Sequence, residues 1–214
     1  MVKPMRQWFN QFVAALFAVA AIGCVGARRS SPAAAGTPLE QKLAQNPDDP
    51  QVNIALGEAS EGAGDLLRAE QYYLRAEALG VPQDRIVPRL VRVLVAAHRY
   101  DEALDRCRRR LTTRPEDRAT RFVEAALLVA LERPKEAERE LAALVRTKPD
   151  DPQAYLALGK LYRDGYNDRP RARAMFEKYL ELAPSGEAAP AVRFELADEP
   201  PAAPPATPDK EERP

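Results

Sequence analysis

Small and large apolar residues recur along this chain at intervals of about 34 residues. Alanines fall at positions 69, 103, 137 and 172, and prolines fall at positions 115, 149 and 184. The segment NPDDPQVNIALG, which begins at Asn46, returns as KPDDPQAYLALG at Lys148, three such intervals later. Self-similarity at one fixed period is typical of repeat proteins. The pattern therefore predicts a row of similar structural units over residues 50–186.

Within each unit, the small residues predict two helices that pack closely. The Leu-Gly pair that ends at Gly57 and again at Gly159 supplies one large and one minimal side chain at the helix crossing, and the alanines lie where the second helix approaches most closely. Tyr73 and Phe176 each follow an alanine by four residues and are expected to fill the remaining space. Each recurring proline ends a second helix, and the Asp-Asp or Glu-Asp that follows offers N-caps for the next helix.

These marks resemble the tetratricopeptide repeat (TPR) family, whose repeat of 34 residues is a helix-turn-helix. We identify four repeats, with bounds at 50–83, 84–117, 118–151 and 152–186. The resemblance implies an all-α fold, a right-handed TPR solenoid of about four repeats with short capping helices and disordered ends. Capping helices are expected within 39–49 and 187–199, over Leu39–Gln45 and Ala191–Ala197, because terminal repeats need a polar cover.

Repeats one and four match the family pattern well, whereas repeats two and three depart from it. Glycine is replaced by Val91 and Ala125, and the aromatic residue is replaced by Cys107 and Leu141. Arg110 stands where a second small residue is expected. We assign the extra residue of repeat four to its inter-helix turn, residues 166–168, because turns tolerate insertions.

The N-terminal pattern is typical of a secretion signal. Lys3 and Arg6 precede twelve uninterrupted apolar residues, Phe12 to Gly23. A helix that crosses a bilayer needs roughly 20. A permanent transmembrane helix is therefore the weaker interpretation.

The sequence Ala-Ile-Gly-Cys ending at Cys24 resembles the lipobox of bacterial lipoproteins. The resemblance implies that residues 1–23 are cleaved and that Cys24 carries acyl chains such as palmitate, with residues 24–38 as a flexible tether. Val25, rather than Asp, after the cysteine suggests the outer membrane, facing the periplasm, by analogy with sorting in enteric bacteria. A plain signal peptide with an incidental Cys24 is the alternative.

Composition excludes several classes of function. The 32 basic and 32 acidic residues balance, so no global field attracts nucleic acid. We interpret the one basic run, Arg106 to Arg110, as a solvated face. The single histidine, His98, falls in a predicted turn, and no phosphate loop, nucleophile elbow or calcium-loop spacing occurs. Cys107 is expected in the core. We therefore expect no enzyme, cofactor, metal or small-molecule substrate.

The TPR resemblance also implies a binding groove. In the family, the second, fifth, ninth and twelfth places of each repeat line a concave surface that grips a partner. Those places are here Gln51, Ile54, Glu58, Glu61, Arg85, Pro88, Arg92, Val95, Ala119, Phe122, Ala126, Val129, Gln153, Leu156, Lys160 and Arg163. The pattern predicts an acidic first repeat, an apolar centre and basic residues in repeats two and four. Alternatively, Phe122 packs in the core.

The carboxylate-clamp form of this groove needs Lys and Asn where this chain has Ile54 and Glu58. Binding of chaperone C-termini in that manner is therefore not supported. The resemblance to envelope TPR lipoproteins, such as pilotins and assembly scaffolds, implies a non-catalytic adaptor that is tethered by Cys24 and binds one or more envelope proteins. Two alternatives stay open: a cell-wall-associated or enzymatic accessory protein that acts through its proline-rich C-terminal tail, Pro184 to Pro214, whose last residues, 200–214, are acidic, and a cytoplasmic-facing adaptor with an uncleaved anchor.

Overall fold

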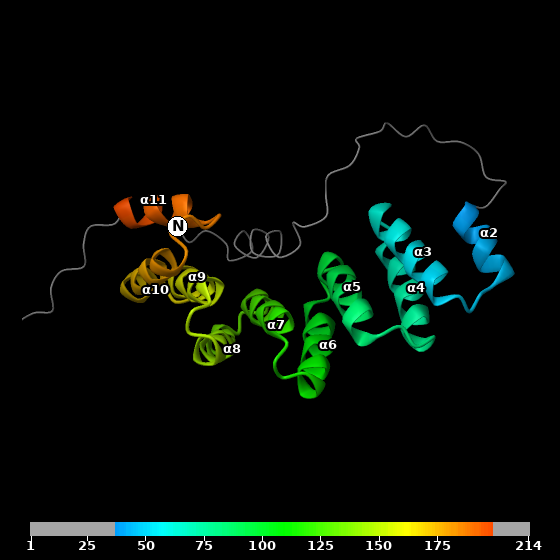
Figure 1. Ribbon diagram of the computed structural model, residues 1–214, viewed down its shortest axis with the longest axis horizontal. Coiled ribbons are helices and arrows are strands. Elements are labelled where there is room, and N and C mark those ends of the chain that lie inside the picture. Colours follow the sequence, from blue (N-terminus) through cyan, green and yellow to red (C-terminus); the bar gives the residue numbers. More distant parts are fainter. Residues whose placement is uncertain (1–36, 199–214) are drawn as a thin grey trace, which may run out of the picture. The chain divides into compact units, whose positions relative to one another are not determined.

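The computed structural model describes residues 37–198, and within that range the chain is helical with no strand (Figure 1). The elements are α2 (Pro38–Gln45), α3 (Pro50–Gly62), α4 (Leu66–Ala78), α5 (Gln83–Ala96), α6 (Tyr100–Thr113), α7 (Arg118–Ala130), α8 (Pro134–Thr147), α9 (Pro152–Lys160), the π-helix η1 (Leu161–Gly165), α10 (Arg169–Leu182) and α11 (Ala189–Asp198). This confirms the predicted all-α class with about four helix-turn-helix pairs and short capping helices. The predicted signal peptide, Cys24 and the tail 200–214 lie outside the described residues.

The chain divides into two compact units. Of the described residues, 37–144 form unit 1 and 145–198 form unit 2. Unit 1 holds α2 to α7 and most of α8, with a core of small and branched side chains from consecutive helices. Unit 2 holds α9, η1, α10 and α11 around Leu156, Ala172, Phe176, Tyr179, Ala189 and Val192.

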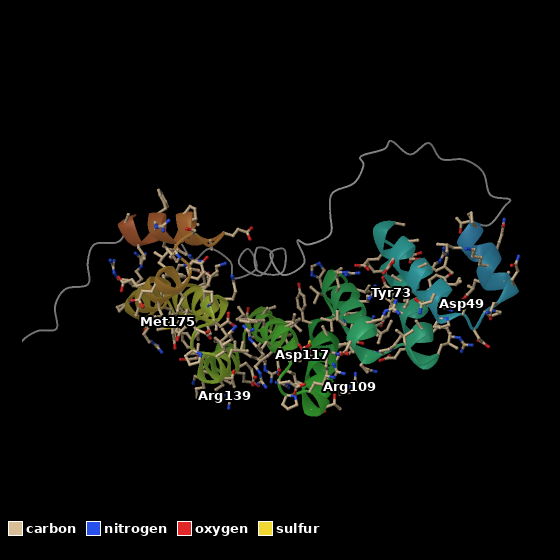
Figure 2. The ribbon with its side chains drawn as sticks, viewed as in Figure 1. Asp49, Tyr73, Arg109, Asp117, Arg139 and Met175 are labelled. Carbon is tan, nitrogen blue, oxygen red and sulfur yellow. The ribbon has the colours of Figure 1, made fainter. Side chains whose placement is uncertain are left out.

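Aspartates cap five helices, α3, α4, α7, α9 and α10, and the caps of α3, α7 and α9 are those that the sequence predicts. Asp49 Oδ1 accepts hydrogen bonds from the backbone of Gln51 at 2.8 Å and of Val52 at 3.2 Å, and so caps α3 (Figure 2). Asp117 and Asp151 cap α7 and α9 in the same way. A prolyl residue follows the cap of α3 and α9, where its missing N–H costs nothing.

Each repeat turns between its two helices through a residue of positive φ. These residues are Gly64, His98, Glu132 and Asn167, with φ of 79°, 58°, 58° and 52°. In the first three repeats the next amide bonds to a carbonyl five residues earlier, for example Arg133 N to Leu128 O at 2.8 Å. This is the bond that closes a Schellman motif.

Repeat four closes the same turn over six residues, with Asp168 N bonded to Tyr162 O at 2.8 Å. Its first helix ends in the π-turn η1, and the positive-φ residue Asn167 comes one residue later than in the other repeats. The prediction that the insertion lies in the turn, residues 166–168, is therefore wrong. The π-turn absorbs the extra residue within the helix.

Large and small side chains alternate at the crossing of the paired helices. A Cβ on Gly57 would lie 2.4 Å from Tyr73 Cε1, and a Cβ on Gly159 would lie 2.5 Å from Phe176 Cε1. At the corresponding positions, repeat two buries a valine and a cysteine, and repeat three buries an alanine and a leucine. Repeats two and three thus replace a glycine-aromatic pair by two side chains of intermediate size.

The last helix, α11, is longer than predicted. It begins at Ala189 rather than Ala191, because Pro190 lies in its first turn, where a proline removes no helical hydrogen bond. Ala189 and Val192 are buried in the core of unit 2. The Tyr179 hydroxyl accepts a hydrogen bond from Ala188 N at 3.2 Å and fixes the start of this helix.

Candidate functional site

Most apolar groove positions are buried, whereas Pro88, Ala119 and most polar positions are accessible. Glu58 and Arg85 are exposed on the first helices of repeats one and two. The larger apolar members are only slightly exposed, at 4% for Ile54, 9% for Val95, 9% for Phe122, 2% for Val129 and 6% for Leu156. This burial favours the alternative in which Phe122 packs in the core. The expected apolar centre is therefore not open to a partner.

The two acidic groove positions of repeat one pair with arginines of repeat two, of which Arg92 is itself a groove position. Arg89 Nη2 lies 2.7 Å from Glu58 Oε1. Arg92 donates to both carboxylate oxygens of Glu61, with a distance of 2.7 Å between Nη2 and Oε2. Both pairs join α5 to α3. The acidic first repeat and the basic second repeat thus neutralise each other instead of presenting opposite charges separately.

Glu61 also connects the two helices of repeat one. The hydroxyl of the buried Tyr73 donates to Glu61 Oε2 at 3.0 Å. Burial, and then the charge of Glu61, raise the pKa of Tyr73 above its ordinary value. The network of Tyr73, Glu61 and Arg92 therefore holds α4, α3 and α5 together, and two predicted groove residues have a structural role.

In unit 2, the predicted basic positions Lys160 and Arg163 are half-buried. Burial, and then the neighbouring Arg163, lower the pKa of Lys160. Arg163 lies 2.7 Å from Asp164 and 2.5 Å from Glu195 of α11, and its guanidinium carbon is 5.8 Å from the ring centroid of Phe176. Glu195 therefore neutralises part of the positive charge that the sequence predicts for the groove.

The residues with catalytic potential have ordinary structural surroundings. His98 is exposed in the α5–α6 turn, with Nδ1 2.7 Å from the Tyr100 hydroxyl. Cys107 is a free thiol that is 1% exposed, and burial raises its pKa to about 12. A thiol must ionise to act as a nucleophile, which this environment opposes. Within residues 37–198, no three His, Cys, Asp or Glu side chains gather into a potential metal site.

The basic run on α6 is less open to solvent than predicted, because most of its arginines form ion pairs. Of its four arginines Arg109 is exposed, and the side chain of Arg108 is 41% exposed. Arg106 pairs with Glu77 at 3.0 Å, Arg108 pairs with Glu124 and Glu136 at 3.1 Å each, and Arg110 pairs with Asp84 and Asp117. The interpretation of this run as a solvated face is therefore wrong for Arg106 and Arg110, whose side chains are largely buried.

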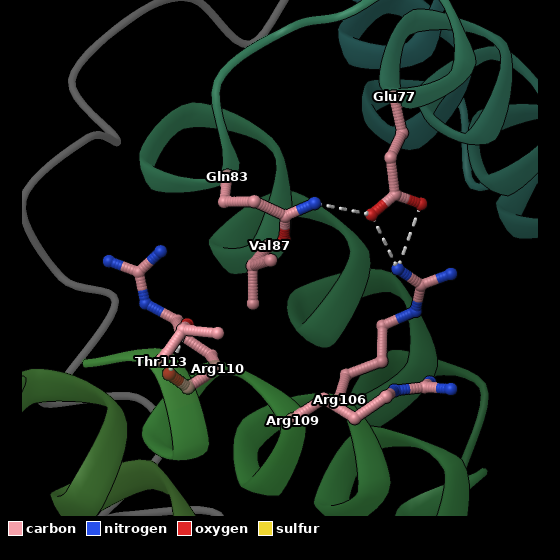
Figure 3. A pocket seen from close by; sticks show the side chains of 7 residues that line it. All are labelled: Glu77, Gln83, Val87, Arg106, Arg109, Arg110 and Thr113. Carbon is pink, nitrogen blue, oxygen red and sulfur yellow. Dashed lines mark hydrogen bonds and ion pairs between the residues drawn. The ribbon is translucent and has the colours of Figure 1, made fainter. Parts of the chain in front are cut away.

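A pocket in unit 1 lies against this run (Figure 3). It is lined by Glu77, Gln83, Val87, Arg106, Arg109, Arg110 and Thr113. Positions 106, 109, 110 and 113 are spaced to share one helix face. This spacing is the sequence signal that indicates the pocket-lining face of α6. Of the four arginines only Arg108 points to the opposite side, where it pairs with Glu124 of α7 and Glu136 of α8.

No helix in the described part of the chain is both long and apolar enough to span a membrane. The predicted lipidation site Cys24 lies outside that part. Membrane attachment is therefore an expectation of the sequence alone.

Comparison with known proteins agrees with the repeat pattern. Residues 94–161 match a family model for the tetratricopeptide repeat. This segment includes most of repeats two and three, the two that depart most from the family pattern. No curated protein sequence matches the chain significantly.

Several solved structures share the fold. YrrB, described as a TPR protein with an unusual peptide-binding site, is 19% identical, with a TM-score of 0.59 over 73% of this chain and 80% of its own. PilF of Pseudomonas aeruginosa is 20% identical, with a TM-score of 0.56 over 75% of this chain and 72% of its own. MamA of Desulfovibrio magneticus is 19% identical, with a TM-score of 0.54 over 70% and 86%. The family match and the shared fold together show that this chain contains tetratricopeptide repeats.

Proposed function

We propose that this chain is a membrane-anchored bacterial lipoprotein whose repeats act as a non-catalytic scaffold for a protein partner in the cell envelope. The observation that carries the proposal is the combination of a lipobox-like sequence at Cys24 with a repeat fold that serves protein–protein interaction. The balanced charge of the chain argues against a nucleic-acid partner. The partner is expected to belong to a secretion, pilus, motility or cell-wall machine.

The contact surface on unit 1 is expected to be polar. Its larger apolar groove positions, Ile54, Val95, Phe122 and Val129, are buried, whereas Glu58 and Arg85 are exposed. The Arg89–Glu58 pair already satisfies part of this charge, and the Glu58 side chain retains half of its exposure. A partner would therefore exchange internal ion pairs for intermolecular ones, and its binding would weaken as salt increases.

Site-specific photo-crosslinking in the producing cell tests this surface. A photoreactive residue replaces Arg85 on α5 or, as the control, the exposed Arg139 on α8. We expect one discrete envelope protein to crosslink from position 85 and not from position 139. Equal crosslinking from both positions, or from neither, would contradict the groove model.

The same experiment separates the tail alternative, in which a segment of 184–214 binds the partner. The predicted start of that tail is wrong, because α11 (Ala189–Asp198) contributes Ala189 and Val192 to the core of unit 2, so the chain should be cut after Asp198. A cut before α11 would disturb the fold. Retained crosslinking from position 85 in the shortened chain supports the groove, and complete loss supports the tail.

A further inference from the structure

The arginine-lined pocket of unit 1 is separate from the predicted groove positions. Its walls come from the end of α4, the first turns of α5 and one face of α6 (Figure 3). None of the sixteen groove positions lines it. Gln83, Arg109 and Thr113 form an exposed rim, and the buried Val87 contributes an apolar wall. The pocket therefore offers a polar entrance over a small apolar surface.

The charges around the pocket are nearly, but not completely, compensated. Arg106 and Gln83 both donate to Glu77, at 3.0 and 3.2 Å. Asp84 accepts from Arg110 at 2.8 Å and from Arg114 at 2.6 Å, and the Arg110 hydrogen bond is the main reason that the pKa of Asp84 is lowered. These two carboxylates are thus already engaged by arginines.

Arg110, which also lines the pocket, adds a further positive charge. It occupies the position where repeat one has the buried Ala76, and its side chain is only 9% exposed. Asp117 and Thr120 accept from Nε, whereas Nη1 is buried without a hydrogen-bond partner among the described residues. Burying a guanidinium at a small-residue position is costly unless it is compensated. Asp84 and Asp117 compensate its charge, but its hydrogen bonding is incomplete at Nη1.

Arg109 carries the remaining charge. Its guanidinium forms no ion pair or hydrogen bond with any residue in the range 37–198, and it reaches the pocket from the same face of α6 as Arg106 (Figure 3). In and next to the pocket there are four arginines, at 106, 109, 110 and 114. There are three carboxylates, those of Glu77, Asp84 and Asp117, and they pair with Arg106, Arg110 and Arg114. One positive charge is therefore left at the exposed rim.

We propose that this pocket binds a carboxylate side chain from an acidic segment of a protein partner. The carboxylate pairs with Arg109, and its methylene groups lie against Val87. A single excess charge matches a carboxylate monoanion better than a phosphate group, which carries nearly two charges at pH 7. Arginine also binds carboxylates with two parallel hydrogen bonds, which gives direction to the contact. The repeats thus carry a second contact surface, built mainly by second helices.

The test uses the full-length chain and a short acetylated peptide, Ala-Glu-Ala-Glu-Ala-amide, with the glutamine analogue as the uncharged control. Binding is followed by NMR through the Nε–H resonances of the arginine side chains. Arg109→Gln is the test variant. Arg139→Gln is the matched control, because Arg139 is equally exposed on a helix of the same unit and does not line the pocket. Inorganic phosphate is titrated separately.

We expect the acidic peptide to shift the Arg109 resonance saturably and the glutamine peptide to leave it unchanged. Arg109→Gln should weaken binding about fivefold, as for an exposed ion pair, whereas Arg139→Gln should not change it. Equal effects of the two variants, or shifts spread over all exposed arginines, would overturn the proposal. Saturation by phosphate that the acidic peptide does not displace would assign the pocket to a free anion and overturn the protein source. None of these readouts depends on Cys24 or on the groove.

Discussion

At the scale of single residues, two glycines set the distance between paired helices. The ring atoms of Tyr73 and Phe176 occupy the space that a side chain on Gly57 or Gly159 would need. The aromatic side chains are almost fully buried and cannot move into solvent. The glycines are therefore required by packing, since neither has a positive φ.

Gly159→Ala should lower the free energy of unfolding by about 2 kcal/mol, because the added Cβ overlaps the Phe176 ring. Adding Phe176→Leu should recover part of the loss, since the pair then matches Ala125 and Leu141 of repeat three. Gly62→Ala is the control, because its Cβ would meet nothing within 4 Å. Urea denaturation measures all three. A Gly159→Ala variant as stable as the Gly62→Ala variant would show that the helices separate easily.

Asp117 has two functions, as the cap of α7 and as the partner of Arg110. Burial raises its pKa, but hydrogen bonds from Thr120 and Arg110 outweigh this effect, so its pKa is lowered overall. A lowered pKa means that the ionised form stabilises the fold. This contribution is fully present above about pH 4, the ordinary pKa of aspartate, and is lost as the pH falls through the lowered pKa.

Asp117→Asn should therefore destabilise the fold by about 2 kcal/mol at pH 7, because Arg110 loses one of its charged partners. The difference from the unchanged protein should shrink as the pH falls below about 4, because Asp117 is then protonated in the unfolded chain before it is protonated in the folded protein. Thermal unfolding between pH 7 and pH 3 measures this trend. The exposed Asp150→Asn is the control, and a difference that does not vary with pH would refute the ion-pair explanation.

At the scale of the elements, the inter-helix turns repeat one geometry with different residues. Glycine fills the positive-φ position in repeat one, whereas His98, Glu132 and Asn167 fill it in the others. Side chains other than glycine pay a steric cost in this region, and asparagine pays least. His98 is held by its contact with Tyr100, and Glu132 is exposed.

Glu132→Gly should raise the stability of the protein by about 0.5 to 1 kcal/mol, because glycine adopts a positive φ without strain and is the residue that repeat one has at this position of the turn. The reciprocal change, Gly64→Glu, should destabilise by a similar amount. Calorimetry of both variants measures the two shifts in melting temperature. If the two changes shift the melting temperature in the same direction, the positive φ does not control these turns.

Local signals explain why much of this element structure could be predicted. The caps by Asp49, Asp117 and Asp151 depend on side chains within three residues of the amides they bind. The π-turn at Leu161–Gly165 could not be predicted, because a helix end and a loop can both absorb one residue and the choice depends on packing around Tyr162. The sequence therefore predicts the correct repeat for the extra residue but assigns it to the turn instead of the end of the first helix.

At the scale of the whole molecule, the repeat period established the fold class, but the ion pairs determine which charges remain available. Arg92 and Arg163 occupy expected groove positions, yet Glu61 and Glu195 engage them. These partners lie about 32 residues away and belong to a neighbouring helix, so only the folded chain reveals them. The spacing of Arg106, Arg109 and Arg110 predicts one shared face of α6, but only the folded chain shows that Arg106 and Arg110 are paired with carboxylates.

The central claim is that lipid on Cys24 tethers these repeats to a bacterial membrane. The most direct measurement is the intact mass of the membrane-extracted protein, with Cys24→Ser as the control. We expect a mass that lacks residues 1–23 and carries added acyl groups, and an unacylated protein in the control. An unmodified full-length mass in the membrane fraction would contradict the claim and favour an uncleaved anchor.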